Sequence, residues 1–289
     1  MVLESATIPA TAEKALISIE DISHPWRGTT FSREDWAEGL DIKVLADDSD
    51  IDILFWVGCT EALEDRSIRV AQAVAKLLKL AEVKFGILGF EESCCGEPAR
   101  RLGNEYLFQL QALKNIELLK RYKVKKIVTA CPHGYNTLKN EYPQFGGSFF
   151  EVMHHTEFIA NLLIDGKLNI TKKDNSPVTY HDPCYLGRHN NLYELPRRIL
   201  TKVPGITLVE MKNNRQSSFC CGGGGGHMWL ERGGGQQINE MRLAQAADTK
   251  AKTIITACPW CIEMLEDGMA AVTEPLRVMD IAEYLVKQL

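Results

Sequence analysis

Short hydrophobic runs alternate along the chain with longer segments of helical periodicity. The runs at 51–58 (IDILFWVG), 125–130 (KKIVTA) and 252–257 (KTIITA) are typical of buried strands. Between them, 64–81 and 104–122 repeat apolar residues at i, i+3, i+4 and i+7, which indicates amphipathic helices. Strands that alternate with helices predict parallel sheets with helices packed on both faces.

The length and charge narrow the class of protein. A chain of 289 residues is long enough for about two domains of roughly 150 residues each. Its net charge of -5 gives no reason to expect a nucleic acid or an anionic membrane as partner. The first 21 residues carry acids and no long apolar run, and no apolar stretch is long enough to cross a bilayer. We therefore expect a cytoplasmic protein that reaches a membrane only through partners.

The cysteines show that the chain is internally duplicated. The nine are Cys59, Cys94, Cys95, Cys131, Cys184, Cys220, Cys221, Cys258 and Cys261. The first four recur at offsets of 125, 126, 126 and 127 as Cys184, Cys220, Cys221 and Cys258. Cys261 has no counterpart, because Gly134 stands at the equivalent position. Such a repeat defines the architecture and argues against cysteines scattered at random through a core.

Each cysteine group follows a strand-like run, so the topology places it at a defined edge. In parallel sheets ligands bind beyond the carboxyl ends of the strands. We therefore predict an α/β fold of two pseudo-symmetric, Rossmann-like halves at 51–165 and 177–289, with the cysteines at the C-terminal strand ends. A connector at about 165–177 joins the halves. Residues 1–50 show little periodicity and are interpreted as an extended arm whose Trp26 and Trp36 dock against another surface.

Four kinds of chemistry compete for these thiols. Structural zinc takes four ligands, one fewer than the second half offers. A thioredoxin-like dithiol explains CPWC at 258–261 but not the recurring Cys184 and the adjacent pair Cys220–Cys221. Inert core cysteines do not account for the repeat. Thiolate-bound iron–sulfur clusters explain most of the pattern, since a fifth thiolate from an adjacent pair can bridge two irons or hold an opened cluster.

The run CCGGGGGH at 220–227 supports that interpretation. Iron–sulfur clusters bound by thiolates carry negative charge, which backbone N–H groups near the sulfurs offset. Glycines let the backbone approach that closely, so Gly222 and Gly223 are expected to form part of a cradle. A dinucleotide loop fits poorly, because the last glycine of its fingerprint would fall on His227.

The combined motifs resemble the cysteine-rich CCG-domain family. A cysteine, then Cys-Cys-Gly, then Cys-x-x-Cys, occurring twice, is similar to the B and D subunits of heterodisulfide reductase. It is also similar to the iron–sulfur subunits of glycolate, lactate and glycerol-3-phosphate oxidising systems. CCGEPARRLGNEYLF, HDPCYLGRHN and ACPWC carry this resemblance, which covers 52–289. In fused relatives an arm like 1–50 follows a ferredoxin-like module, which this chain is expected to lack.

The resemblance implies different cofactors for the two halves. The second half matches the five-cysteine pattern that holds a noncubane [4Fe-4S] cluster where a disulfide is split. The set is Cys184, Cys220, Cys221, Cys258 and Cys261, with Cys220, Cys221 and His227 as catalytic candidates. The first half keeps Cys59, Cys94, Cys95 and Cys131. Because Gly134 replaces its last ligand, a conventional or smaller iron–sulfur cluster or zinc is open there, with His133 as a possible substitute ligand.

For the other charged and titratable residues near the cysteines, the sequence supports less specific roles. His181, His189 and His227 are candidates to donate protons or to hydrogen-bond the loops. Arg100, Arg101 and Arg188 are candidates to offset cluster charge. His154 and His155 open a helical segment and are interpreted as packing or capping residues.

The resemblance implies an electron-transfer subunit of an oxidoreductase complex. Its expected partners are a ferredoxin-like iron–sulfur subunit and a flavoprotein subunit. The second cluster would reduce a disulfide or oxidise thiols. The alternatives are an electron relay between a flavoprotein and a quinone-linked or bifurcating complex, and a zinc-bearing scaffold.

Overall fold

Two parallel sheets form the framework of the computed structural model, which describes residues 8–230, 237–274 and 276–289. The first has the order β1-β3-β2-β4-β5 and the second β7-β6-β8-β9, and all the pairings within them are parallel. The first-sheet strands are β1 Lys43–Val44, β2 Ile53–Phe55, β3 Phe85–Ile87, β4 Lys126–Thr129 and β5 Glu151–His154. Those of the second sheet are β6 Pro177–Tyr180, β7 Thr207–Leu208, β8 Thr253–Thr256 and β9 Arg277–Asp280. The predicted α/β fold with two Rossmann-like halves is confirmed.

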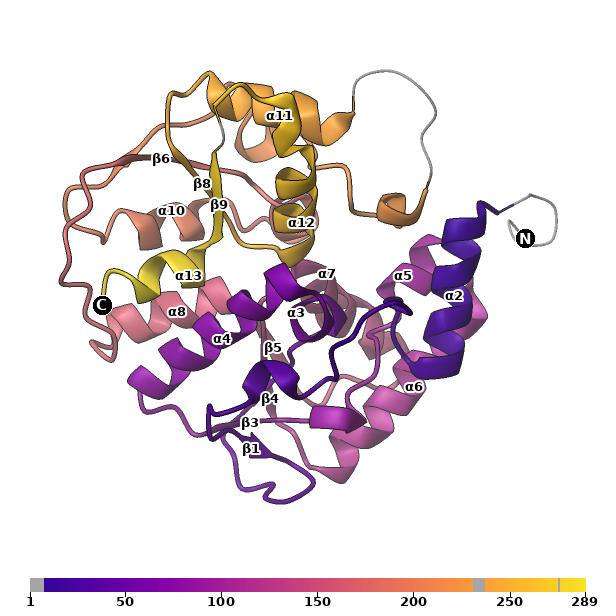
Figure 1. Ribbon diagram of the computed structural model, residues 1–289. Helices are drawn as coiled ribbons and strands as arrows, with labels where there is room; N and C mark the ends of the chain where they lie inside the picture. The colour runs from indigo at the N-terminus through magenta and orange to yellow at the C-terminus, as the bar shows by residue number, and fades with distance from the viewer. Residues whose placement is uncertain (1–7, 231–236, 275) are drawn as a thin grey trace.

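Helices cover both sheets, and some of them lie between the two halves (Figure 1). In the first half they are α3 Cys59–Leu63, α4 Asp65–Leu80, α5 Glu97–Arg101, α6 Glu105–Arg121, α7 Pro132–Asn136 and α8 His155–Ile164. In the second they are α9 Cys184–Gly187, α10 Glu194–Leu200, α11 Ile238–Ala247, α12 Pro259–Asp267 and α13 Ile281–Val286. The buried stripe of α4 packs against α13, and one hydrophobic cluster includes Val128 of β4 and Ile254 of β8. The two halves therefore share a core.

The duplication extends to the helix caps. His154 caps α8 and forms a capping box with Glu157, while Asp280 caps α13 and forms one with Glu283. Both residues of the second box lie 126 positions after those of the first, the offset of the adjacent cysteine pairs. The side-chain cap and the returning carboxylate each satisfy a backbone N–H that the first helical turn leaves free. The capping role expected of His154 is confirmed.

The segment before residue 51 differs from the extended arm expected of it. Residues Ala10–Ile22 form helix α2, whose buried face includes Leu16 and Ile19, and β1 extends the first sheet at its edge. Trp36 is buried edge-on against Phe55 of β2. The sequence did not reveal α2 as an amphipathic helix, because alanine and serine occupy part of its buried face and differ little in hydrophobicity from the exposed face.

No helix within the described ranges is long and apolar enough to cross a membrane. The longest of them, α6, has 17 residues and alternates charged with apolar positions. A span needs about 20 consecutive, mostly apolar residues.

Candidate metal centres

Both halves place single cysteines at the start of a helix that follows a sheet strand. Cys59 begins α3 after β2, and Cys184 begins α9 after β6. Cys131 and Cys258 are the N-cap residues of α7 and α12, each followed by proline. The N–H groups of Gly134 and Cys261 hydrogen-bond to the sulfurs of those two N-caps. Helix N-termini favour the thiolate form, which is the form that binds metals.

The two Cys-Cys-Gly corners have the same backbone geometry. Gly96 and Gly222 have φ of +85° and +100°, which a residue with a side chain adopts only with strain. Each turns its N–H back to the first sulfur of the pair, with N–Sγ distances of 3.4 Å to Cys94 and 3.3 Å to Cys220. The glycine in this motif therefore supplies an N–H donor to the sulfur of the first cysteine of the pair.

The four cysteines of the first half come together as one group, here called the first site. Cys59, Cys94, Cys95 and Cys131 line a small cavity of about 30 Å³. Cys59 and Cys94 hydrogen-bond to each other, and Cys94 also bonds to Cys95. The hydrogen bond from Cys94 lowers the pKa of Cys59 to about 6. Arg33 acts in the same direction, and burial opposes both.

Arg33 is a buried part of this site that the sequence did not reveal. Its Nη2 lies 3.2 Å from the Cys59 sulfur, and its Nη1 lies 3.2 Å from the Glu92 carboxylate. Glu92 also accepts the backbone N–H groups of Val57 and Gly58, at 3.0 and 2.7 Å, and so fixes the loop that leads to Cys59. Arg33 was missed because it comes from the N-terminal segment, far from any cysteine motif.

The five cysteines of the second half also come together, here called the second site. Side-chain hydrogen bonds connect Cys184 to Cys220, Cys220 to Cys221, Cys221 to Cys261 and Cys261 to Cys258. The bonds from Cys184 and Cys221 lower the pKa of Cys220 far below its usual range. Burial alone would raise the pKa of Cys258, but hydrogen bonds from Cys261 and His133 lower it to about 6.

The glycine run curves closely around the second site. Gly225 and Gly226 also have positive φ, at +69° and +79°. A Cβ at Gly223 would lie 2.8 Å from the Met264 side chain, and one at Gly224 would lie 3.6 Å from the Cys184 sulfur. Side chains have little room here, and the backbone passes next to the sulfurs.

His181 faces the second site with a fixed ring orientation. One of its nitrogens lies within 4.8 Å of the sulfurs of Cys221 and Cys261. Arg242 Nε donates to His181 Nδ1 at 3.0 Å. A guanidinium can only donate, so Nδ1 accepts and Nε2 carries the proton. Burial and Arg242 lower the pKa of His181 to about 3, so the ring is neutral and presents an N–H, not a lone pair. His181 therefore suits a hydrogen-bond donor and not a metal ligand.

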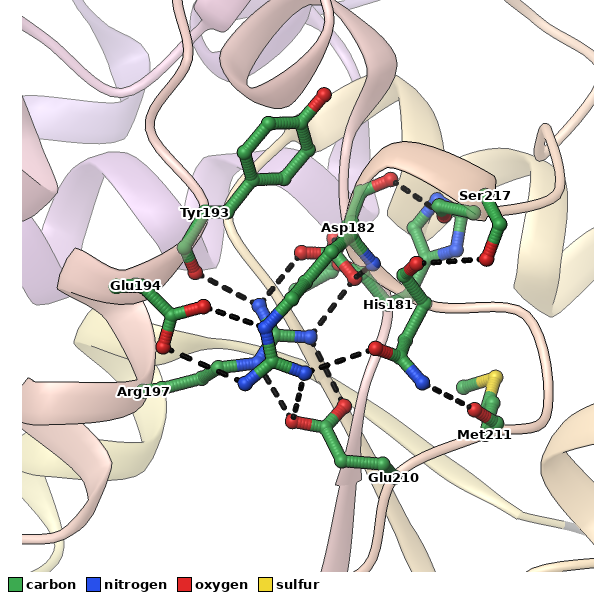
Figure 2. A network of polar contacts seen from close by, with 12 residues as sticks. His181, Asp182, Tyr193, Glu194, Arg197, Glu210, Met211 and Ser217 are labelled. Carbon is green, nitrogen blue, oxygen red and sulfur yellow. Dashed lines mark hydrogen bonds and ion pairs between the residues drawn. The ribbon is translucent and has the colours of Figure 1, made fainter.

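An ion-pair network holds the loop that connects β6 to Cys184 (Figure 2). Asp182 accepts Nη1 and Nη2 of Arg197 at 2.7 and 2.9 Å, and the backbone N–H of Arg215 at 2.8 Å. Glu210 pairs with the other side of Arg197, at 2.6 Å from Nε. Two fork-shaped contacts on one guanidinium fix the loop orientation strongly.

A stack of rings separates the two sites. His133 lies between Tyr185 and Trp260, with ring centroids 4.0 and 4.4 Å apart. Its Nδ1 is 3.2 Å from Glu97, and the ring also hydrogen-bonds Cys258. Burial opposes its protonation, but Glu97 and then Cys258 raise the pKa of His133 to about 10. His133 comes from the first half and contacts a sulfur of the second, while Trp260 of the second half lines the first cavity.

The remaining candidates lie outside the sulfur groups. His227 is exposed and lines a cavity of about 390 Å³ next to Gly222 and Met264. His189 stacks on Tyr185. Arg100 and Arg101 both pair with Glu141, and Arg188 donates to the Ser218 carbonyl. Within the described residues, the arginine that hydrogen-bonds a cysteine sulfur is Arg33, and not Arg100, Arg101 or Arg188.

The donor sets fit thiolate-bound metal centres. All nine cysteines are free thiols in buried or half-buried positions. Five thiols in the second site exceed what tetrahedral zinc takes and suit an iron–sulfur cluster. The buried Nε2 of His181, which lacks a partner in the described part of the chain, points to a group that the protein alone does not provide. The four thiols of the first site suit a cluster or zinc.

Comparison with known proteins matches both halves separately. The family model described as a cysteine-rich domain, CCG, matches residues 53–139 and again 178–266. Two relatives align with 99% of this chain. The EtfAB:quinone oxidoreductase of Syntrophomonas wolfei is 41% identical over 301 residues, and the probable iron-sulfur-binding oxidoreductase FadF of Bacillus subtilis is 42% identical over 296.

A third relative comes from the dihydromethanophenazine:CoB--CoM heterodisulfide reductase of Methanosarcina barkeri. Its D subunit is 34% identical over 252 residues, which cover 82% of this chain. The chain spans 42% of the first two relatives and 59% of this one.

Proposed function

Because the chain belongs to the cysteine-rich CCG-domain family, we propose that it is an iron–sulfur oxidoreductase subunit whose second site reduces a disulfide or oxidises thiols. The observation that carries this proposal is the continuous group of five thiols, which includes the adjacent pair Cys220–Cys221. Five sulfurs with a vicinal pair suit a noncubane [4Fe-4S] cluster better than a cubane, which needs four. The first site would hold a second cluster or zinc.

The reaction consumes two electrons and two protons for each disulfide and releases two thiols. A cluster bound in the second site would supply or accept those electrons one at a time. The five cysteines would hold it. The N–H groups of Gly222 and His181 lie near the sulfurs, and the stacked rings of Trp260 and His133 pack beside them.

A substrate has an approach beside the glycine run. The cavity of about 390 Å³ is lined by Gly222, which directly follows Cys221, and by the exposed His227. Cavities of about 300 Å³ and above accommodate small-molecule ligands. We assign His227 as the proton donor to the departing thiolate, since its imidazole lies at the wall of this cavity, close to Gly222.

The relatives favour an electron relay as the second candidate. The EtfAB:quinone oxidoreductase aligns with 99% of this chain, which covers 42% of that relative's own length. In that role the first site receives electrons from a flavoprotein or ferredoxin-like partner, and the second passes them toward a quinone-linked partner without breaking a bond.

Anaerobic purification with iron and acid-labile sulfide analysis tests the shared part of both candidates. We expect a coloured protein with iron and sulfide in similar amounts. A colourless preparation that contains zinc and no sulfide would establish the scaffold alternative and refute both.

Cys221→Ala then separates disulfide chemistry from a relay, with Cys95→Ala of the first half as its matched control. We expect a thiol substrate to change the paramagnetic resonance spectrum of wild type and Cys95→Ala, but not of Cys221→Ala, and disulfide reduction to cease in Cys221→Ala. Full reductase activity in a folded Cys221→Ala protein contradicts the assignment. A wild-type spectrum indifferent to thiols favours the relay.

A further inference from the structure

Besides the missing cysteine, the two halves differ in a buried residue close to the first cysteine of each half. Gly134 stands where the second half has Cys261, and Glu61 stands where it has Leu186, at the offset of 125 that relates Cys59 to Cys184. Both Glu61 and Leu186 are fully buried in the helix that begins at those cysteines. The half that lacks a thiol therefore carries a buried carboxyl group instead of an apolar side chain.

Glu61 has no polar partner of its own. Neither of its carboxyl oxygens accepts or donates a hydrogen bond within the part of the chain that the structure describes. A fully buried carboxyl group without a partner is strongly unfavourable, and such groups are normally paired or bound to a metal. The three ionisable groups that act most on it, Asp280, Cys258 and Glu92, are all acidic. Among the described residues, none of the ionisable groups that act most on Glu61 is a cation.

The carboxyl group lies beside the first site, close to Cys131. A Cβ built at Gly58 would lie 3.4 Å from Glu61 Oε2 and 4.0 Å from the Cys131 Cβ, so both flank the same point. Gly58 itself lines the first cavity together with Cys131 and Gly134. A Cβ built at Gly134 would make only ordinary van der Waals contacts, at 3.8 Å from Thr129 Oγ1 and 3.9 Å from the Cys131 Cβ, so a cysteine fits at this position.

We propose that Glu61 is an oxygen ligand of the metal centre in the first site and replaces the thiolate that Gly134 does not provide. The proposal rests on the proposed function, because it requires metal in that site. Carboxylate oxygens are hard ligands that bind iron beside thiolates only where the protein places them, so one iron of the first cluster would differ from the thiolate-bound irons.

The test converts the first half to the pattern of the second in two steps. Glu61→Leu introduces the residue of the second half, and Glu61→Leu with Gly134→Cys also restores its fifth thiol. Asp280→Asn is the control: it changes another fully buried carboxyl group close to Glu61, and asparagine still caps α13. Each protein is purified anaerobically with ⁵⁷Fe. Iron content, Mössbauer spectrum and thermal unfolding are then measured.

We expect wild type and Asp280→Asn to show an iron component with a larger isomer shift than thiolate-bound iron. Glu61→Leu loses that component and part of its iron. The double variant regains the iron with a thiolate-only spectrum. An unchanged Mössbauer spectrum in Glu61→Leu overturns the inference. A loss of iron that Gly134→Cys does not reverse, or that Asp280→Asn also shows, overturns it as well. Wild type that binds no iron at all would refute the proposed function instead, whereas iron confined to the second site would overturn this inference alone.

Discussion

The two sites have similar sulfur positions and different supporting residues. In the second site the loop before the first cysteine is held by Asp182, Arg197 and Glu210, all from the same half. In the first site the equivalent loop is held by Glu92, whose charge is balanced by Arg33 from the N-terminal segment. Backbone geometry around the sulfurs has thus been kept since the duplication, while the charged groups that stabilise it come from different parts of the chain.

The comparison also shows that the sites are not independent. His133 of the first half contacts Cys258, and Trp260 of the second half lines the first cavity. Cys131 packs in the same buried cluster as Cys221, Cys258 and Cys261. A change at the ring stack is therefore expected to reach both sites, whereas a change in either loop anchor is expected to stay local.

The largest effects should come from removing the loop anchors. Arg33→Met and Arg197→Met each leave a buried carboxylate without its partner, which costs about 3–5 kcal/mol of unfolding free energy. Denaturant unfolding measures the loss. Iron analysis should show that Arg33→Met weakens the first site and Arg197→Met the second.

Two further variants make this test specific. Glu92→Gln combined with Arg33→Met should recover part of the stability, because the unpaired charge is gone. Arg215→Met removes partly exposed ion pairs with Glu194 and Glu210, leaves the buried Arg197–Asp182 pair in place, and should cost about 0–1 kcal/mol. Equal losses in Arg33→Met and Arg215→Met would show that burial of the anchor has little importance.

Much of this arrangement could be predicted from the sequence. The hydrophobic runs and the cysteine offsets are local or periodic signals. They predicted the parallel sheets and the position of the cysteines at the C-terminal ends of the strands. A close backbone approach at Gly222 was also expected from the glycine run, whereas the matching corner at Gly96 was not predicted.

The residues that complete the sites could not be predicted in the same way. Arg33 reaches Cys59 from 26 positions away, and Arg242 reaches His181 from 61 positions away, through contacts that only the folded chain creates. Nothing in the local sequence distinguishes them from surface arginines. Arg100, Arg101 and Arg188 were closer to cysteines in sequence, yet they bond to Glu141 and to a backbone carbonyl.

An intermediate effect is expected from His133, which carries a charge to the second site. Its pKa of about 10 makes it cationic at neutral pH, and a cationic hydrogen-bond donor stabilises the more negative, reduced form of a cluster. His133→Gln should lower the reduction potential of the second site by roughly 90 mV, taking about 2 kcal/mol for a charged hydrogen bond and a one-electron couple. Redox titration followed by paramagnetic resonance measures it.

The control for His133 is Tyr185→Phe, which keeps a ring in the stack and removes only the hydroxyl that bonds Arg101. Its second-site potential should stay close to that of the wild type. If both variants shift the potential equally, the stack acts through packing and the charge of His133 has no separate effect.

The smallest effect is expected from His181, because its N–H is neutral. Arg242 fixes the proton on Nε2, so the ring presents a neutral N–H to the second site, near the sulfurs of Cys221 and Cys261, and cannot gain charge near neutral pH. A neutral hydrogen bond is worth about 1 kcal/mol, which corresponds to roughly 40 mV for one electron. His181→Phe should lower the second-site potential by that amount and leave it independent of pH between 6 and 8.

Trp56→Phe, at the equivalent position of the first half, should not change the second-site potential. A larger shift in His181→Phe than in His133→Gln would mean that His181 binds the metal directly, and the fixed proton inferred from Arg242 would then be wrong.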